Sequence, residues 1–586
     1  MSSSVRSLVR ILIGATMFLT ALCGLAQTNT PSTSGVPPVS NPCAPRFAAG
    51  SVIQNPPALF SSNGALNVRF SYQQTTDSVG RLLHCLMTDT GIQEPTLHLN
   101  AGDTLNITVT NNTPKSKFGE TYNPPNCGDS TVQFTGGANG INTIGSSLNI
   151  HYHGTNTTPQ CGGDNVVRTL INSGHTFQYH VLFPTDEPPG LYWYHPHVHG
   201  LAERDLLGGA TGALVVDGIQ NVQPAVSGLR ERILVIRDQP QVQGLPEGGG
   251  NCGEDVPFQD ISVNYIPIDS HATFNPDGSL KSITFTPAVL HMETNETQFW
   301  RVTNSTADTI LDLQVLYDGV PQTLQIVEID AVPVNSQDGP QPGKLISATE
   351  FRLPVAGRVG FLIKAPASTV KVAQLFTNNI NTGPQGDCDP GRPIFNIVLT
   401  GDSDLAAATA DDRVPVSAAL STSQQKFGGL SNTMVSTKRV FQFSEIQPGE
   451  FFITQVSAGQ PRQVFDNNNP PAVITTQGAI EQWTIQNVAQ ENHEFHQHQI
   501  HFKVLAQNNY EINGNPSTPA DNGQFLDMIE VPFWDNVKNP NPSQVPAAVL
   551  LMDFRGMDIG QFVYHCHILS HEDLGMMATI QVNPAP

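Results

Sequence analysis

The segment YHCHILSHEDLGMM, residues 564–577, constrains the fold of this chain more than any other stretch. It places His565 and His567 on either side of Cys566. In an extended strand successive side chains point to opposite faces, so the two histidines share one face and the cysteine points to the other. One strand therefore supplies side chains to two sites. We expect the rest of the chain to position this strand and the other residues of both sites.

On the face of the cysteine, two more potential ligands follow at short offsets. His571 lies five residues after Cys566, and Met576 lies ten residues after it. Thiolate, imidazole and thioether together favour copper, and a His2Cys set with a weak axial Met is the blue-copper electron-transfer arrangement. That arrangement needs one more histidine from elsewhere in the chain. A structural zinc site and a buried core cysteine are the alternatives at this point.

Three further segments bring histidines together. NIHYHG and LYWYHPHVHG each carry a pair at alternate positions, which aims two imidazoles at one face of a strand. One such pair is more often an ordinary buried polar pair, but two pairs make a metal site the better interpretation. ENHEFHQHQIHFKVL adds a third, denser group. The histidines of the three segments are His151, His153, His195, His197, His199, His493, His496, His498 and His501.

Length and composition favour several β domains. A chain of 586 residues is too long for one ordinary core and suggests three or four domains. With 50 Gly, 45 Pro and only 13% charged residues, the chain favours short strands and turns over long helices. Its 50 acidic and 28 basic residues give a net charge of -22, which would repel nucleic acid and anionic membranes. We therefore expect no nucleic-acid partner and no membrane partner.

The N-terminus has the features of an export signal. Arg6 and Arg10 precede an apolar run over residues 11–25, and small residues precede a cleavage point after Ala26. We therefore expect the mature protein to be periplasmic or secreted. Apart from the signal cysteine and Cys566, an even number of cysteines remains, compatible with disulfides whose pairing the sequence leaves open. They are Cys43, Cys85, Cys127, Cys161, Cys252 and Cys388.

Segments typical of strands, bounded by Asn, Asp, Gly and Pro, predict three domains. TLHLNAGDTLNITVTNNT, residues 96–113, predicts two strands around a turn at Gly102 and Asp103. The middle domain has no clustered histidines, so we expect it to space the other two and to form part of a substrate surface. The predicted organisation is a signal peptide at 1–26, a tether at 27–46, domains at 47–226, 227–401 and 438–586, and a linker with some helix at 402–437.

The histidine motifs occur along the chain in the order HxHG, HxH, HxxHxH and HCHxxxHxxxxM. With this order the chain resembles the multicopper oxidases of the laccase-like, three-domain type, over essentially the whole mature chain. The resemblance implies an all-β fold of three consecutive cupredoxin-like domains, each a Greek-key β-sandwich or barrel. It also implies four copper ions, namely one type 1, one type 2 and two type 3, with dioxygen as electron acceptor.

The resemblance also carries ligand roles onto particular residues. It implies a type 1 copper on His493, Cys566, His571 and Met576, the last of them axial. It implies a type 2 copper on His151 and His496, and a type 3 pair on His153, His195, His197, His498, His565 and His567. Four of the eight trinuclear ligands come from the first domain and four from the third, so we expect the trinuclear cluster at their interface.

The resemblance implies one-electron oxidation of a substrate at the type 1 site, transfer through Cys566 and reduction of dioxygen to water. Because this reduction consumes protons, carboxylates near the cluster should act as proton relays. By resemblance these are Asp164 and Glu572, and the alternative for each is a solvated acid.

Two positions depart from the family pattern, and two histidines exceed it. Glu494 stands where the family frequently has proline, and Gln499 stands where glycine is frequent. Neither change removes a ligand. We expect the surplus His199 and His501 to orient ligands or to bond to the backbone.

The reducing substrate is less constrained than the metal sites. Only 10 Met occur, and none cluster outside the copper loop, so we prefer a phenol or an aromatic amine. Asp527 is a weak candidate for substrate contact, as the acceptor of a phenol proton or the ligand of a cation, and is otherwise a strand-end acid with local hydrogen bonds. The alternatives are an oxidase of Cu(I), Fe(II) or Mn(II) in copper resistance or metal homeostasis and, more remotely, a non-enzymatic copper-binding or electron-transfer protein. We expect a monomer.

Overall fold

The computed structural model describes residues 43–114, 127, 145–241, 256–338, 344–387, 389–400, 412–416, 425–447, 449–512, 515–516 and 522–586. Its regular structure is almost entirely β, which confirms the predicted fold class. The predicted signal peptide, most of the tether and much of the linker lie outside the described residues. Within the described part of the chain, no helix is long and apolar enough to cross a membrane.

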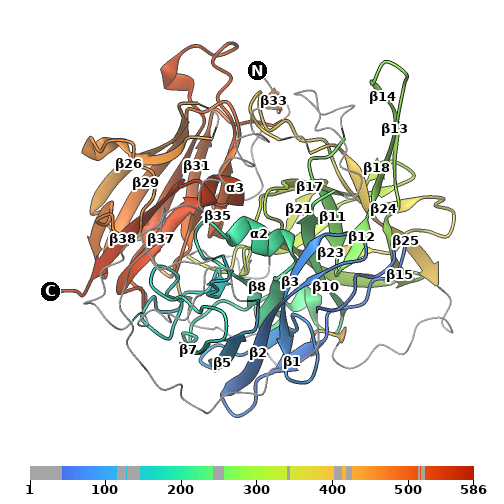
Figure 1. The fold of residues 1–586 in the computed structure, drawn as a ribbon, viewed down its shortest axis with the longest axis horizontal. Helices are drawn as coiled ribbons and strands as arrows, with labels where there is room; N and C mark the ends of the chain where they lie inside the picture. The colour runs from blue at the N-terminus through green and yellow to red at the C-terminus, as the bar shows by residue number, and fades with distance from the viewer. Residues whose placement is uncertain are drawn as a thin grey trace.

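Two sheets form the N-terminal lobe, drawn from blue to teal in Figure 1. One has the order β1 (Ala58–Phe60), β4 (Thr96–Leu99), β9 (Gly212–Val216), β8 (Gly190–His195) and β6 (His151–His153). The other has the order β3 (Leu82–Thr88), β2 (Ala65–Thr76), β5 (Thr104–Asn111) and β7 (Thr176–Leu182). Alternating apolar side chains of both sheets meet in one core, which includes Leu97, Ile107 and Tyr152.

The strands predicted around Gly102 are present, but they do not pair with each other. Gly102 has φ +89, as a tight turn requires. Strand β4 pairs with β1 and β9, whereas β5 pairs with β2 and β7. The turn therefore carries the chain from one sheet of the sandwich to the other.

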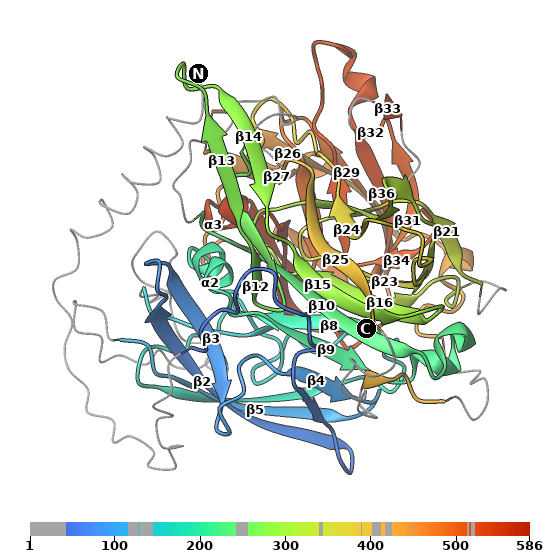
Figure 2. The ribbon, with the colours of Figure 1, turned by 90° about the vertical axis from the view of Figure 1, so that its right-hand side faces the viewer.

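Two larger sheets and a hairpin form the middle lobe. The first sheet has the order β12 (Ile266–Ile268), β11 (Asp260–Val263), β10 (Arg230–Gln239), β16 (Thr297–Asn304), β23 (Arg358–Lys364), β19 (Leu324–Ile329) and β20 (Val332–Pro333), with β21 (Ile346–Ala348) on β19. The second has the order β15 (Ala288–Glu293), β25 (Arg392–Thr400), β24 (Ala373–Thr377), β17 (Leu311–Tyr317) and β18 (Val320–Pro321), with β22 (Phe351–Leu353) on β17. The hairpin of β13 (Ser270–Phe274) and β14 (Leu280–Phe285) projects from the lobe (Figure 2).

The C-terminal lobe has the same two-sheet construction. One sheet has the order β27 (Phe451–Gln455), β26 (Thr437–Glu445), β29 (Ile480–Asn487), β36 (Ala547–Asp553), β31 (Phe502–Asn508) and β34 (Phe525–Leu526). The other has the order β28 (Val473–Thr476), β38 (Met577–Asn583), β37 (Gly560–Cys566), β30 (His493–Gln497) and β35 (Met528–Val531). Strands β32 (Glu511–Ile512) and β33 (Asn515–Pro516) form a separate pair.

Short helices occur at the ends of strands and in loops. The α-helices are α2 (Ala202–Leu207) and α3 (Leu569–Asp573). The 3-10 helices are η1 (Ile219–Asn221), η2 (Pro224–Val226), η4 (Leu430–Asn432), η5 (Val456–Ala458) and η6 (Pro542–Gln544). Helix α2 follows the second histidine motif and contacts α3, so these two helices lie where the N-terminal and C-terminal lobes meet.

The three lobes surround a common centre (Figure 1). A continuous apolar cluster runs through the middle and C-terminal lobes and includes Trp300 and Trp483, whereas the N-terminal lobe has its own core. Disulfides join Cys43 to Cys85 and Cys127 to Cys161. Cys252 and Cys388 lie outside the described residues. The domain limits predicted from sequence stay a prediction.

Candidate metal centres

The predicted type 1 residues come together inside the C-terminal lobe, in a group that we call the sulfur site: His493, Cys566, His571 and Met576. The Cys566 Sγ lies 3.7 Å from His493 Nδ1 and 3.8 Å from His571 Nδ1, and the two Nδ1 atoms are 3.1 Å apart. The register that pairs Phe495 with Cys566 places β30 beside β37 and so brings the first histidine to the cysteine. Met576 is buried beside them, with its carbonyl accepting from the Cys566 N–H.

The eight predicted trinuclear ligands meet between the N-terminal and C-terminal lobes, in a group that we call the histidine cluster. Two sets of three lie within it and share no member, with their ligand nitrogens within 4.8 Å of one another. One set is His197, His498 and His565, and the other is His153, His195 and His567. A third set, His151, His153 and His496, overlaps the second at His153, and the rings of His151 and His496 have centroids 5.8 Å apart.

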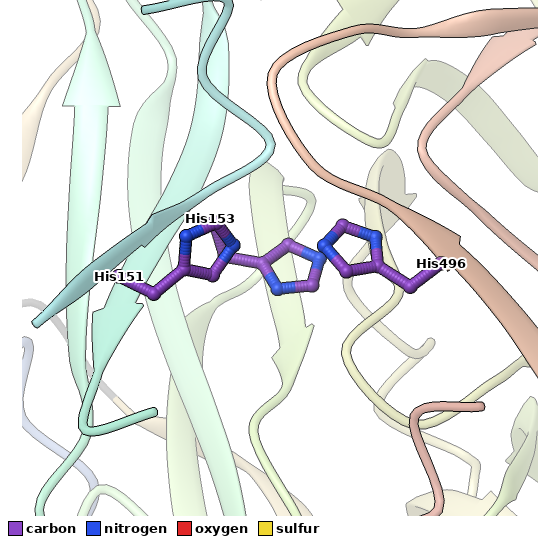
Figure 3. Close-up of side chains that lie close together, drawn as sticks. All are labelled: His151, His153 and His496. Atoms are coloured by element: carbon purple, nitrogen blue, oxygen red, sulfur yellow. The ribbon is translucent and has the colours of Figure 1, made fainter. Parts of the chain in front are cut away.

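Strand alternation explains how each lobe presents its histidines. His151 and His153 flank Tyr152 on β6, whose side chain enters the core, and His195 ends β8. Figure 3 shows His151 and His153 on one side and His496, from β30 of the other lobe, on the opposite side. Their imidazoles converge on the space between the lobes.

Glycine after the first motif permits a close approach of the middle lobe. Gly154 has φ +84, and a Cβ there would lie 2.3 Å from Arg358 and 2.5 Å from Asp527. Any larger residue would therefore force the Arg358 guanidinium or the Asp527 carboxylate to shift. The glycine of the HxHG motif therefore leaves room for Arg358 and Asp527 beside the histidine cluster.

The donor set fits metal ions. The Nε2 atoms of His197, His498 and His565 are all 3.2 Å apart, and neutral imidazoles cannot satisfy one another in a closed triangle of this kind. Three nitrogens that surround one cation at about 2 Å have this type of spacing. The buried Nε2 atoms of His151 and His496 have no hydrogen-bond partner among the described residues.

The lowered pKa values of the cluster histidines also favour a metal site. Burial, reinforced by neighbouring histidines, lowers the pKa of His151 and of His498 well below the usual value. A histidine must be neutral to bind a metal, so the pocket holds its imidazoles in the binding form.

Both predicted relay carboxylates touch the histidine cluster. Asp164 lies 2.9 Å from His151 Nδ1 and accepts from Gln499 Nε2 at 2.7 Å. Glu572 lies 3.1 Å from His565 Nδ1 and 3.5 Å from the Nδ1 of a second ring, His197. Burial raises the pKa of both carboxyls well above the usual range. Neither is a solvated acid.

The departure at residue 499 has a structural reason. Gln499 has φ +60, in the left-handed region that favours glycine, and still carries a side chain. That side chain donates to Asp164, which contacts His151. The residue therefore adds a hydrogen bond that glycine could not donate to this carboxylate, which also accepts from the Tyr152 N–H at 3.4 Å.

The interpretation of Asp527 as a substrate-contact residue is wrong. Asp527 is fully buried and forms an ion pair with Arg358, with Oδ1 2.6 Å from Nη1. The same Oδ1 lies 3.3 Å from His153 Nε2, and the backbone carbonyl accepts from His496 Nδ1 at 2.8 Å. Asp527 lies between β34 and β35 and faces the middle lobe through its ion pair with Arg358.

Arg358 is the residue that sequence reasoning missed. It lies on β23 of the middle lobe, is fully buried and also contacts Asp330. The two carboxylates raise its pKa despite burial. The middle lobe is therefore more than a spacer, because it supplies the cation that holds Asp527 against the histidine cluster. An isolated arginine far from every histidine motif gives no sequence signal for this role.

The surplus histidines lie outside the metal groups of the described residues. His199 packs edge-on against Phe465, with ring centroids 5.0 Å apart. His501 places Nε2 2.9 Å from the Asp330 carbonyl and 3.6 Å from Asp527. Burial lowers the pKa of each histidine to about 4. His501 therefore bonds to the backbone and borders the Asp527 carboxylate.

Two segments of the chain, residues 137–221 and 433–586, match family domains that are both described as multicopper oxidase. A multicopper oxidase LPR1 homolog 1 of Oryza sativa subsp. japonica is 23% identical over 480 residues, which cover 74% of each chain. A laccase of Bacillus subtilis is 21% identical over 431 residues, covering 69% of this chain and 72% of that one. The solved multicopper oxidase of Campylobacter jejuni, described as a metallo-oxidase, aligns with a TM-score of 0.58 at 18% identity, over 92% of this chain and 96% of that one.

The chain belongs to the multicopper oxidase family. It is an oxidoreductase that uses copper and dioxygen, and its paired sheets form cupredoxin-like domains. Copper is therefore the metal that the sulfur site and the histidine cluster are built to hold.

Proposed function

We propose that this enzyme couples one-electron oxidation of a reducing substrate at the sulfur site to four-electron reduction of dioxygen to water at the histidine cluster. The observation that carries this proposal is the partition of the ligands. The sulfur site, the two histidine triads that share no member, and the His151 and His496 pair, which forms an overlapping set with His153, would hold one type 1, two type 3 and one type 2 copper. Copper in these positions would supply the electron transfer and the reduction of dioxygen.

The chain joins the two centres covalently. Cys566 belongs to the sulfur site, His565 to one triad and His567 to the other, so consecutive residues span all three groups. The backbone around the cysteine is held by hydrogen bonds to Met576 and Glu494. This fixed segment is the shortest covalent link between the substrate side and the dioxygen side.

Protons would reach the histidine cluster through Asp164 and Glu572. Each carboxyl lies against Nδ1 of a different cluster histidine, and burial keeps each one in the protonated form more readily than an exposed acid. They can therefore hold a proton beside the site where water is formed.

Oxygen uptake tests the proposal directly. Fully copper-loaded protein should consume one dioxygen for every four electrons that the donor supplies, without release of peroxide. An electron-transfer protein or a copper carrier would show the blue absorption of the sulfur site and no uptake. Absence of uptake with several good one-electron donors would contradict the oxidase.

For the substrate we propose a phenol or an aromatic amine. Among the sulfur-site residues His571 alone retains exposed surface, about 4%, so electrons should enter at this ring. Its Nε2 lies 3.4 Å from the Glu491 carboxylate. A carboxylate at this point can accept the proton that a phenol loses on oxidation. Glu491 thus occupies the role for which Asp527 was considered.

Metal-ion oxidation is the second candidate, and the same carboxylate favours it. Glu491 can bind Fe(II), Mn(II) or Cu(I) beside His571, and the net charge of -22 would attract cations. Steady-state rates of wild type and Glu491→Gln with a phenol, an aromatic amine and the three ions distinguish the candidates. A loss confined to the metal ions would contradict the phenol assignment.

We also propose that the enzyme works as a monomer outside the cytoplasm, in the periplasm or as a secreted protein. The two disulfides support an oxidising compartment, where such bonds persist. N-terminal sequencing of the protein from a cell fractionation should give a mature chain that begins after Ala26. Sedimentation measures its oligomeric state.

A further inference from the structure

The sulfur of Cys566 receives a hydrogen bond that depends on the identity of residue 494. The backbone N–H of Glu494 donates to Cys566 Sγ at 3.4 Å. Glu494 directly follows His493, so the donor belongs to the same strand that supplies the first histidine of the sulfur site. The bond is buried, since both residues have no exposed surface.

Strand geometry explains why this N–H is available to the sulfur. In an antiparallel strand the N–H and C=O of one residue point to the same neighbour. The Glu494 carbonyl accepts from His567 N–H at 2.9 Å, so its own N–H also faces β37. Strand β37 ends at Cys566, and the sulfur stands where a backbone acceptor would otherwise lie. The ladder between β30 and β35 does not use this N–H.

Proline at this position would remove the bond. Proline alone among the residues has no backbone N–H. The multicopper oxidases that this chain resembles frequently have proline directly after the first type 1 histidine, and this chain has Glu494 there. The substitution leaves every ligand in place, but it adds one donor to the sulfur.

We propose that the Glu494 N–H raises the reduction potential of the sulfur site above that of an otherwise equal site with proline. The inference rests on the proposed role of this site as the type 1 copper. Hydrogen bonding around the cysteine sulfur tunes the potential of such a site. A donor at the sulfur withdraws negative charge from it, which destabilises the oxidised metal more than the reduced metal. One hydrogen bond corresponds to about a tenfold change in the equilibrium constant of reduction.

The side chain of Glu494 can be separated from its N–H by mutation. On a strand the side chains of Glu494 and His493 point to opposite faces, but burial raises the pKa of Cys566 and this effect is reinforced by the Glu494 carboxylate. It is fully buried, and burial together with Glu530 raises its pKa well above the usual range. Arg352 lies close enough to lower that pKa again in part. Alanine and glutamine remove the carboxyl and keep the N–H, whereas proline removes both.

The test compares Glu494→Pro with Glu494→Ala in the full-length, copper-loaded protein. Anaerobic redox titration of the blue absorption gives the potential of the sulfur site. We expect the proline variant to lie below the alanine variant by about 59 mV, which is a tenfold change for one electron. We expect Glu494→Gln to match the alanine variant more closely than proline does. Equal potentials in the proline and alanine variants would overturn the inference.

A measurement on the wild type keeps the test valid if the proline variant does not fold. Electron–nuclear double resonance of the oxidised protein, labelled with 15N at glutamate alone and produced in H2O and in D2O, should detect the Glu494 nitrogen and its exchangeable proton coupled to the sulfur site, apart from the Ile568 N–H, which also acts on Cys566. Absence of both couplings would overturn the inference. Because neither experiment uses dioxygen, a blue protein without oxygen uptake would contradict the proposed oxidase and leave the Glu494 result standing.

Discussion

The sulfur site and the histidine cluster are adjacent in sequence, because Cys566 lies between His565 and His567, but they differ in how many lobes supply their residues. All four sulfur-site residues lie in the C-terminal lobe, within residues 493–576, on β30, β37, α3 and the loop that follows it. The cluster takes four histidines from each of two lobes and is held by Arg358 from the third. A site within one lobe depends on the folding of that lobe, whereas the cluster also depends on docking.

The two sites also differ in their access to solvent. His571 of the sulfur site reaches the surface beside Glu491, whereas all eight cluster histidines are at most 2% exposed. This difference matches two separate steps of the proposed reaction, electron entry at one site and dioxygen reduction at the other. Under the proposed function, electrons would enter at His571, and dioxygen would be reduced at the buried histidine cluster, with protons supplied through Asp164 and Glu572. Four variants test these differences between the two sites.

The largest effect is expected from Cys566→Ser. Loss of the thiolate should abolish the blue absorption and turnover together, because the cysteine is both a ligand and the link between the two sites. Copper analysis should still find metal in the histidine cluster. Met576→Leu is the control, since it keeps the His2Cys set and should keep the blue colour. Turnover that survives in Cys566→Ser would contradict this account of electron transfer.

Next in size is a ligand substitution in the N-terminal lobe. His195→Gln removes one member of a triad and should lower dioxygen reduction by more than about 100-fold, since mutation of outer partners already costs 10–100-fold. The blue absorption should remain, because the sulfur site takes nothing from that lobe. His199→Gln is the matched control four residues away and should change the rate little. Loss of the blue band in His195→Gln would show that the two sites are not independent.

Arg358→Met tests the contribution of the middle lobe to the cluster. It leaves the buried Asp527 charge unpaired and should cost about 3–5 kcal/mol of stability, measured by denaturant unfolding. Dioxygen reduction should fall, and the blue absorption of the folded fraction should not. The double variant Arg358→Met with Asp527→Leu removes both charges and should recover most of the stability. A double variant as unstable as the single one would assign the cost to packing instead of charge.

The smallest effect concerns pH and a buried carboxyl of the middle lobe, that of Asp389. Asp389 accepts from the Ile310 N–H, and burial raises its pKa to about 7. Its unfolded value is about 4, so the folded chain binds this proton more tightly and loses stability as pH rises from about 4 to 7. Asp389→Asn should flatten that part of the stability curve, measured on apoprotein by thermal unfolding at several pH values. An unchanged slope would show that Asp389 is ionised throughout.

Local patterns were enough to predict much of the site. Alternation along a strand predicted that His565 and His567 face away from Cys566, and the family resemblance carried by the histidine motifs assigned the twelve residues that the structure brings into two centres. The all-β class followed from composition and strand patterns in the same way. Such inferences succeed because they depend on the geometry of a few consecutive residues, which every strand shares.

Tertiary structure alone decided what joins one lobe to another. It paired Arg358 with Asp527, placed Glu491 beside His571, separated β4 from β5 into two sheets and joined Cys43 to Cys85. It also grouped the cluster histidines into three triads, of which two share no member and the third overlaps one of them at His153. These partners are far apart in the chain, and their contacts arise only when packed lobes fix their distances. The residue pattern alone is therefore enough to predict which side chains can bind metal. The docking of the three lobes fixes how these side chains are grouped, which residues hold them in place and which of them lies nearest to solvent.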